Sequence, residues 1–138
     1  MGTNYKCIVL CLFVFTAAVI GGCSGKSVLD SPLSNFSPEI INNPDAFSFQ
    51  ITDASNVTAT VTYDWVNTGT QAVIDHSTST TAGSASMRII DADSLEVYTS
   101  GLVASANESS SAGTAGTWKI QLTFVNYSGT SNFRVDKL

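Results

Sequence analysis

Trp118-Lys119-Ile120-Gln121-Leu122-Thr123-Phe124 is the most regular stretch of the chain. Large apolar and polar side chains alternate along it, which is the two-residue period of a β-strand with one buried face. A Tyr127-Ser128-Gly129-Thr130 turn follows, and Phe133 and Val135 then continue the alternation. We therefore expect an antiparallel hairpin in this region, with its apolar face turned toward a core.

The same period occurs further upstream. Apolar and polar residues alternate in residues 47–52 and again in 57–65, and the Asp-Ala-Ser-Asn segment at 53–56 has the composition of a hairpin turn. Shorter candidate strands lie at 71–75, 85–90 and 95–98, and no stretch keeps a helical period. Seven or eight strands in residues 45–138 predict an all-β domain, an antiparallel jelly-roll-like β-sandwich.

Two tryptophans could serve a binding function or a structural one. Trp65 and Trp118 would suit stacking on sugar rings if they were exposed. Both fall on the apolar side of the alternation, so we expect them to be buried.

The end of the domain resembles a known group of sandwiches. Gly116-Thr117-Trp118 opens a long strand, Tyr127-Ser128-Gly129 turns it and Asn132-Phe133-Arg134-Val135 closes the domain. This is similar to the C-terminal end of the pre-peptidase C-terminal (PPC) domains and related jelly rolls of secreted bacterial proteins. The resemblance covers about residues 44–138 and implies a PPC-like domain, here without an attached peptidase.

The first residues have the parts of a secretory signal peptide. Lys6 precedes an apolar run over residues 8–20, which is shorter than the roughly 20 residues that cross a bilayer. The tetrad Ile20-Gly21-Gly22-Cys23 resembles the lipobox of bacterial lipoproteins, whose cysteine receives a diacylglyceryl group and becomes the mature N-terminus. The resemblance implies lipid attachment at Cys23. Plain secretion and a retained membrane helix are the alternatives.

Three segments follow from these boundaries. We expect a signal peptide at 1–22, a lipidated N-terminus with a flexible tether at 23–44, and the β-sandwich at 45–138. The tether region is rich in Ser, Asn and Pro, and its apolar residues keep no period, which is typical of a linker. About twenty flexible residues would hold the domain on the order of 25 Å from the lipid.

The mature chain is acidic and has no cysteine pair. Cys7, Cys11 and Cys23 are the three cysteines, so the domain must rely on packing for stability. Without Lys6, five basic residues stand against eleven acidic ones, which gives a net charge of −6. Such a surface argues against nucleic acid and against a basic membrane-binding patch.

The sequence contains one metal candidate and no catalytic motif. Asp91, Asp93 and Glu96 have oxygen ligands that suit a hard cation such as calcium, although a solvated turn with local backbone bonds is the favoured interpretation. His76 is the single histidine, and no Gly-x-Ser-x-Gly elbow accompanies it. We expect His76 to be exposed at a strand edge, and we expect no enzyme activity and no cofactor beyond the covalent lipid.

These observations predict a membrane-anchored bacterial lipoprotein that displays a non-catalytic β-sandwich for binding or adhesion at the cell envelope. The alternative is a structural or accessory envelope lipoprotein that acts through a protein partner. The expected partners are the membrane, through the lipid, and a glycan or protein ligand. Ser24 follows the lipobox cysteine where an Asp would signal inner-membrane retention, so the resemblance favours the outer membrane in a Gram-negative host.

Overall fold

The computed structural model describes residues 31–138. The expected signal peptide and Cys23 lie outside these residues. In chain order the elements are a 3-10 helix η2 (Ser34–Phe36) and the strands β1 (Glu39–Asn43), β2 (Ala46–Asn67), β3 (Ala72–Ile90), β4 (Glu96–Gly101), β5 (Ala106–Ser109) and β6 (Gly116–Lys137). No helix in the described part of the chain is long and apolar enough to span a membrane.

β6 lies at the centre of the sheet. The strand order is β1-β2-β6-β3-β4, β5 pairs with β3, and all pairs are antiparallel. β6 pairs with β2 on one side and with β3 on the other along nearly its whole length. The stretch Trp118 to Phe124 therefore forms part of the central strand, and its inward residues are at most 1% exposed.

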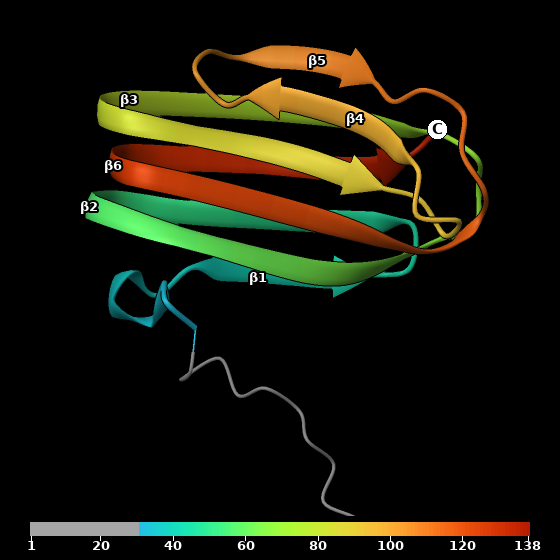
Figure 1. Ribbon diagram of the computed structural model, residues 1–138, viewed down its shortest axis with the longest axis horizontal. Coiled ribbons are helices and arrows are strands. Elements are labelled where there is room, and N and C mark those ends of the chain that lie inside the picture. Colours follow the sequence, from blue (N-terminus) through green and yellow to red (C-terminus); the bar gives the residue numbers. More distant parts are fainter. Residues whose placement is uncertain (1–30) are drawn as a thin grey trace, which may run out of the picture.

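The three long strands bend in the middle. Figure 1 shows β2, β3 and β6 turning back at the same end of the molecule, so that one continuous sheet folds into two packed layers. The bends coincide with register shifts in the strand pairing. Asp53, Asn56 and Asn126 have φ values of 50°, 51° and 47° at these bends. Asp and Asn adopt this left-handed conformation more readily than most residues, so the bends are bulged corners built from suitable side chains.

Two glycines allow the corners to pack closely. Gly83 has a φ of 68° and Gly129 a φ of 145°, both in the range that side chains rarely adopt. A Cβ on Gly129 would lie 2.1 Å from the carbonyl oxygen of Ser79, and a Cβ on Gly83 would lie 2.3 Å from the carbonyl oxygen of Asn126. Any side chain at either position would therefore clash with backbone.

The strand halves define two layers. The first layer contains, from one edge to the other, β1, residues 46–52 of β2, residues 130–137 of β6, residues 72–80 of β3, and β5. The second layer contains residues 57–67 of β2, residues 116–125 of β6, residues 84–90 of β3, and β4. This arrangement confirms the predicted class, an antiparallel jelly-roll-like β-sandwich. The described residues form six strands instead of seven or eight because each long strand continues through a corner.

The two predicted hairpins are wrong. Residues 46–52 of β2 pair with residues 131–136 of β6, and not with the second half of their own strand. Residues 53–56 and 127–130 are therefore corners that carry a strand from one layer to the other. Polar, turn-forming residues indicate where a chain changes direction, but they do not specify which strand the next segment pairs with.

The core lies between the layers and contains both tryptophans. Trp65 and Trp118 have no exposed surface, which confirms their predicted burial. Their indole N–H groups donate to the carbonyl oxygens of Asn43 and Thr114, at 3.1 and 2.7 Å. Each ring thus fills the core and also bonds a neighbouring segment, the end of β1 for Trp65 and the β5–β6 connection for Trp118.

Part of the expected tether belongs to the domain. Leu33 is completely buried, Phe36 and Ile40 pack against the core, and β1 pairs with β2. The η2 segment contacts β2 and lies beside β1. This role could not be predicted from the sequence pattern. The chain turns at Ser37, where φ is 45°, and the buried residues on its two sides therefore do not follow one period. Flexibility of the whole segment 23–44 is therefore wrong from about Ser31 onward.

The opposite side of the sandwich is closed by a side-chain contact. The Tyr98 hydroxyl on β4 donates to Glu108 Oε2 on β5 at 2.8 Å, which links the free edges of the two layers. Burial raises the pKa of Tyr98 to about 12, and the Glu108 carboxylate contributes in the same direction. The hydroxyl therefore stays protonated and keeps donating over the physiological pH range.

Candidate binding groove

His76 is buried and not exposed, which corrects the prediction from sequence. Its side chain has 3% exposure, and neither ring nitrogen has a hydrogen-bond partner among residues 31–138. It lies on the inner face of β3, opposite Phe133 of β6 and Ala106 of β5. Alternation with the buried Ile74 indicates this placement, whereas the polar residue type favours an exposed position. No serine or carboxylate among the described residues bonds to the ring to complete a catalytic triad.

Asp91 is a structural carboxylate in the turn between β3 and β4. Its Oδ1 accepts backbone N–H bonds from Asp93 and Leu95 at 3.0 and 2.8 Å, and its Oδ2 accepts one from Thr114 at 2.8 Å. The bond from Thr114 contributes most to lowering the pKa of Asp91 below its ordinary value. This agrees with the favoured interpretation of a turn with local backbone bonds.

The other two members of the calcium candidate have partners of their own. Asp93 accepts a hydrogen bond from the Thr114 hydroxyl at 2.6 Å, and Glu96 forms an ion pair with Arg88. Within residues 31–138 no group of three His, Cys, Asp or Glu side chains is arranged to hold a metal ion. The structure therefore does not bring Asp91, Asp93 and Glu96 together as a metal site.

An open groove runs over the outer face of the first layer, beside β1. Its volume is about 690 Å³. It is lined by parts of β1, β2 and β6, namely Glu39, Ile40, Ile41, Ala46, Phe47, Ser48, Phe49, Gln50, Asn132, Arg134 and Asp136. Phe47 and Phe49 are 1% exposed because their rings point into the core, so they offer no stacking surface. A ligand would meet hydroxyl, amide and charged groups together with apolar surface, including the exposed side chain of Ile41.

The strand register places the polar groups of the groove in rows. Glu39, Gln50 and Asn132 form one row across β1, β2 and β6, and Ile41, Ser48 and Arg134 form the next. The Asn132 side-chain amide donates to Gln50 Oε1 at 3.1 Å. This bond fixes the Gln50 carbonyl and leaves the Asn132 carbonyl free to accept a bond from a ligand.

Arg134 differs from the other basic side chains of residues 31–138 because it forms no ion pair with a described residue. Residues 31–138 contain four basic side chains, and Arg88, Lys119 and Lys137 each form an ion pair. Arg134 is exposed and makes no hydrogen bond or ion pair with any described residue, although Asp75 is its cross-strand neighbour. Its five N–H donors are therefore available in the groove.

The groove residues were missed as a site by sequence reasoning. Asn132 and Arg134 alternate with the buried Phe133 and Val135, so their outward direction was predictable. Their convergence with Gln50 was not, because it depends on the pairing of β2 with β6. The contribution of β1 to the groove could not be predicted either, because the composition of residues 39–43 is typical of a tether.

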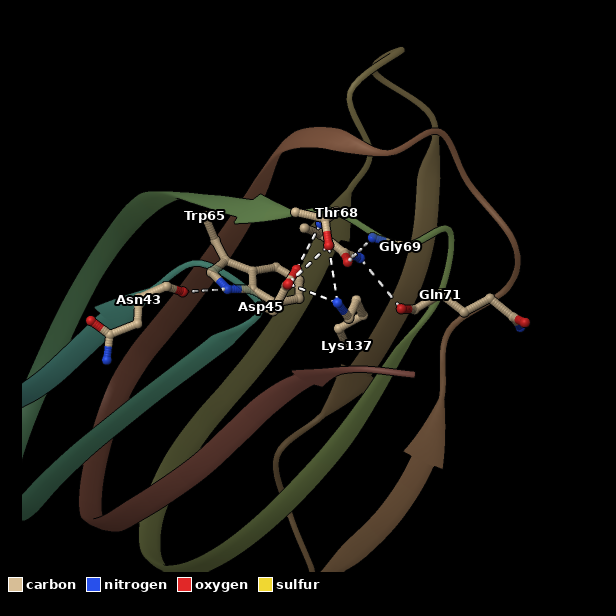
Figure 2. A network of polar contacts seen from close by, with 8 residues as sticks. Asn43, Asp45, Trp65, Thr68, Gly69, Gln71 and Lys137 are labelled. Atoms are coloured by element: carbon tan, nitrogen blue, oxygen red, sulfur yellow. Dashed lines mark hydrogen bonds and ion pairs between the residues drawn. The ribbon is translucent and has the colours of Figure 1, made fainter.

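A separate polar network fastens the end of the domain beyond this groove. Figure 2 shows Asp45 of the β1–β2 turn bonded to Thr68 and Lys137. Thr68 donates its backbone N–H at 2.7 Å and its hydroxyl at 2.8 Å, and Lys137 Nζ donates at 2.8 Å. Hydrogen bonding, first from Lys137 and then from the Thr68 backbone, lowers the pKa of Asp45 to about 2. The cluster joins three segments that are distant in sequence and has a structural role.

Comparison with known proteins gives likenesses of shape alone. No family model matches the chain, and no curated protein matches it. The resemblance to PPC domains therefore stays a prediction.

Solved structures of three kinds are similar to the chain. A family 6 carbohydrate-binding module is 19% identical with a TM-score of 0.39, over 73% of this chain and 82% of that one. A CBM4 structure is 10% identical with a TM-score of 0.40, over 80% and 91%. A glycosylation-associated protein complex (Gap123) from Streptococcus agalactiae is 12% identical with a TM-score of 0.40, over 75% of this chain and 40% of that one. Likenesses at this level support no argument about function.

Proposed function

We propose that this chain is a non-catalytic binding module displayed at a bacterial cell envelope, with its ligand site in the groove on the first layer. The observation that carries the proposal is Arg134. A protein with a net negative charge pairs its other described cations internally and leaves this one exposed in a groove. An unpaired guanidinium, with the free Asn132 carbonyl beside it as an acceptor, is suited to binding a ligand that carries hydroxyl groups.

The ligand chemistry that fits best is a neutral, hydroxyl-rich glycan. Gln50, Asn132 and Ser48 offer amide and hydroxyl groups along the floor of the groove. Glu39 and Asp136 add acceptor oxygens on either side of Arg134, and their negative charge disfavours a polyanion. Since the ring faces of Phe47 and Phe49 point inward, recognition relies on hydrogen bonds instead of stacking.

Binding to purified envelope glycans tests this site. We expect saturable binding by the domain, and Arg134→Gln should weaken it about tenfold or more, since a hydrogen bond to a charged group contributes roughly 1.5–3 kcal/mol. Lys119→Gln is the matched control. It also removes one positive charge from an exposed strand position, but on the outer face of the second layer, where Lys119 pairs with Asp64. Equal affinities for the two variants, or no saturable binding by the unaltered domain, would refute the groove as a glycan site.

The proposed anchor is the lipid on Cys23, and the proposed location is the outer membrane in a Gram-negative host. Replacing Cys23 with Ala should move the protein from the membrane fraction to the soluble fraction. Fractionation of the host envelope then separates outer from inner membrane. Retention of the Cys23→Ala protein on membranes would count against the anchor, and recovery with the inner membrane alone would count against the location.

A protein partner is the second candidate, and β1 supports it. β1 pairs with β2 on one side, and no described strand pairs with its other edge. Ile41 on this strand is 59% exposed. A free edge with an exposed apolar side chain is suited to adding a strand from another protein. Co-purification from intact envelopes that is lost when Ile41 is replaced by Lys, while glycan binding persists, would favour this candidate.

A further inference from the structure

The packed part of the chain begins close to the proposed lipid. Leu33 is completely buried, and it is the first described residue of the core. Ser34 and Phe36 donate backbone N–H bonds to Ser31 and Leu33, at 2.9 and 3.0 Å, which tie the segment to η2. Only the nine residues 24–32 therefore separate Cys23 from a point that is fixed to the domain.

This length sets a strict limit on where the domain can sit. Ten Cα-to-Cα steps from Cys23 to Leu33 span at most about 35 Å when fully extended. A tether of about twenty free residues, as the sequence alone predicts, would have allowed roughly twice that. The limit applies to any conformation of the intervening residues.

The point of attachment lies on one side of the sandwich. Figure 1 shows η2 beside β1, at the edge opposite to β4 and β5. The first layer is five strands wide from β1 to β5. At about 4.8 Å per strand spacing, the two edges lie roughly 19 Å apart.

We infer that the domain is held with its η2–β1 side toward the bilayer, and that the groove therefore opens beside the membrane while the β4–β5 side points away from it. The inference rests on the proposed anchor at Cys23. The opposite orientation would place Leu33 on the far side of the domain, and the tether would have to run past the whole width of the first layer. That would require more than half of the full extension of nine residues, which costs conformational entropy.

The orientation follows from the length of the tether and not from adsorption of the domain surface to the lipid headgroups. The η2–β1 side carries Glu39, and the neighbouring Asp64 has a side chain that is 66% exposed and pairs with Lys119. No basic cluster among the described residues lies on this side to attract anionic headgroups. The orientation should therefore be insensitive to salt and to lipid charge.

Two labelling positions in one row of the first layer test the inference. Ile41, Ser48, Arg134, Asp75 and Asn107 follow one another in register from β1 to β5. Ile41 and Asn107 are both exposed on the same outer face, four strand spacings apart. Cys7 and Cys11 belong to the expected signal peptide and the Cys23 thiol would carry lipid, so a cysteine introduced at either position is the single reactive thiol of the mature protein.

The measurement is energy transfer from a fluorophore at Ile41→Cys or Asn107→Cys to acceptor headgroups in phosphatidylcholine vesicles that contain the lipidated protein. We expect stronger transfer from Ile41→Cys, corresponding to a distance shorter by up to about 20 Å. Inserting twelve Gly and Ser residues after Lys26 should remove most of this difference, because the domain can then turn over.

Each outcome has a distinct meaning. Equal transfer from both positions in the unaltered tether, or stronger transfer from Asn107→Cys, would overturn the inference while leaving the anchor intact. Failure of the full-length protein to associate with vesicles would instead overturn the anchor and, with it, the inference. Glycan binding is measured in a separate experiment, so the test of the groove does not depend on the outcome of the orientation test.

Discussion

Trp65 and Trp118 meet edge to face in the core, with ring centroids 5.9 Å apart and planes at 87°. They are direct cross-strand partners on β2 and β6, and both are fully buried. Because each indole also donates to a backbone carbonyl outside its own strand, the pair links β2 to the end of β1 and β6 to the connection that precedes it.

Replacing Trp118 with Ala should lower the free energy of unfolding by about 3–5 kcal/mol, since it removes a large buried ring and its contact with Trp65. Urea denaturation measures the change. Val66→Ala is the control, because Val66 lies next to Trp65 on the same strand but is 44% exposed. A loss below about 1 kcal/mol for Trp118→Ala would contradict the packing described here.

Gly129→Ala should destabilise the domain by about 1–3 kcal/mol, because the new methyl group would clash with the Ser79 carbonyl in a conformation that is strained for any side chain. Gly101→Ala is the matched control. A Cβ there meets nothing closer than 4.0 Å. Thermal melts of both variants give the comparison, and equal melting temperatures would show that the corner tolerates a side chain.

His76→Leu should stabilise the domain by about 1 kcal/mol. The imidazole is buried and neither nitrogen has a partner among the described residues, so an apolar side chain of similar size avoids the cost of an unsatisfied polar group. His76→Gln keeps a polar group at the same place and should not give this gain. A lower stability of His76→Leu than of His76→Gln would contradict the unpaired ring and indicate that His76 forms a hydrogen bond.

Asp45 should make stability depend on pH in the acid range. Its pKa in the folded domain is about 2, against an ordinary value of 3.8. A carboxyl group whose pKa is lowered by folding contributes stability above its unfolded pKa, and this contribution is lost as pH falls through the folded value. Between about pH 5 and pH 2 the unaltered protein should therefore lose more stability than Asp45→Asn. Parallel acid dependences of the two proteins would exclude this contribution.

The fold class could be predicted from sequence, but the connections within the sheet could not. Alternation identified the buried face of nearly every strand segment, as at Trp118 and Phe133, because burial on one face imposes the period directly. It could not distinguish a corner from a hairpin at Asp53, since the same residues serve both. The groove could not be predicted for the same reason, because Arg134 and Gln50 converge through the pairing of β2 with β6, which no local sequence pattern encodes.

The central position of β6 also has a consequence for folding. β2 and β3 each pair with β6 along their length, and β6 follows both of them in the chain. Neither layer can be completed before β6 is available, so the early part of the chain has no stable sheet to form by itself. Most of the strand pairing joins segments far apart in sequence, which is typical of slowly folding domains. For a protein proposed to be exported, late completion of the sheet would keep the chain unfolded during passage through the membrane and let it fold on the far side.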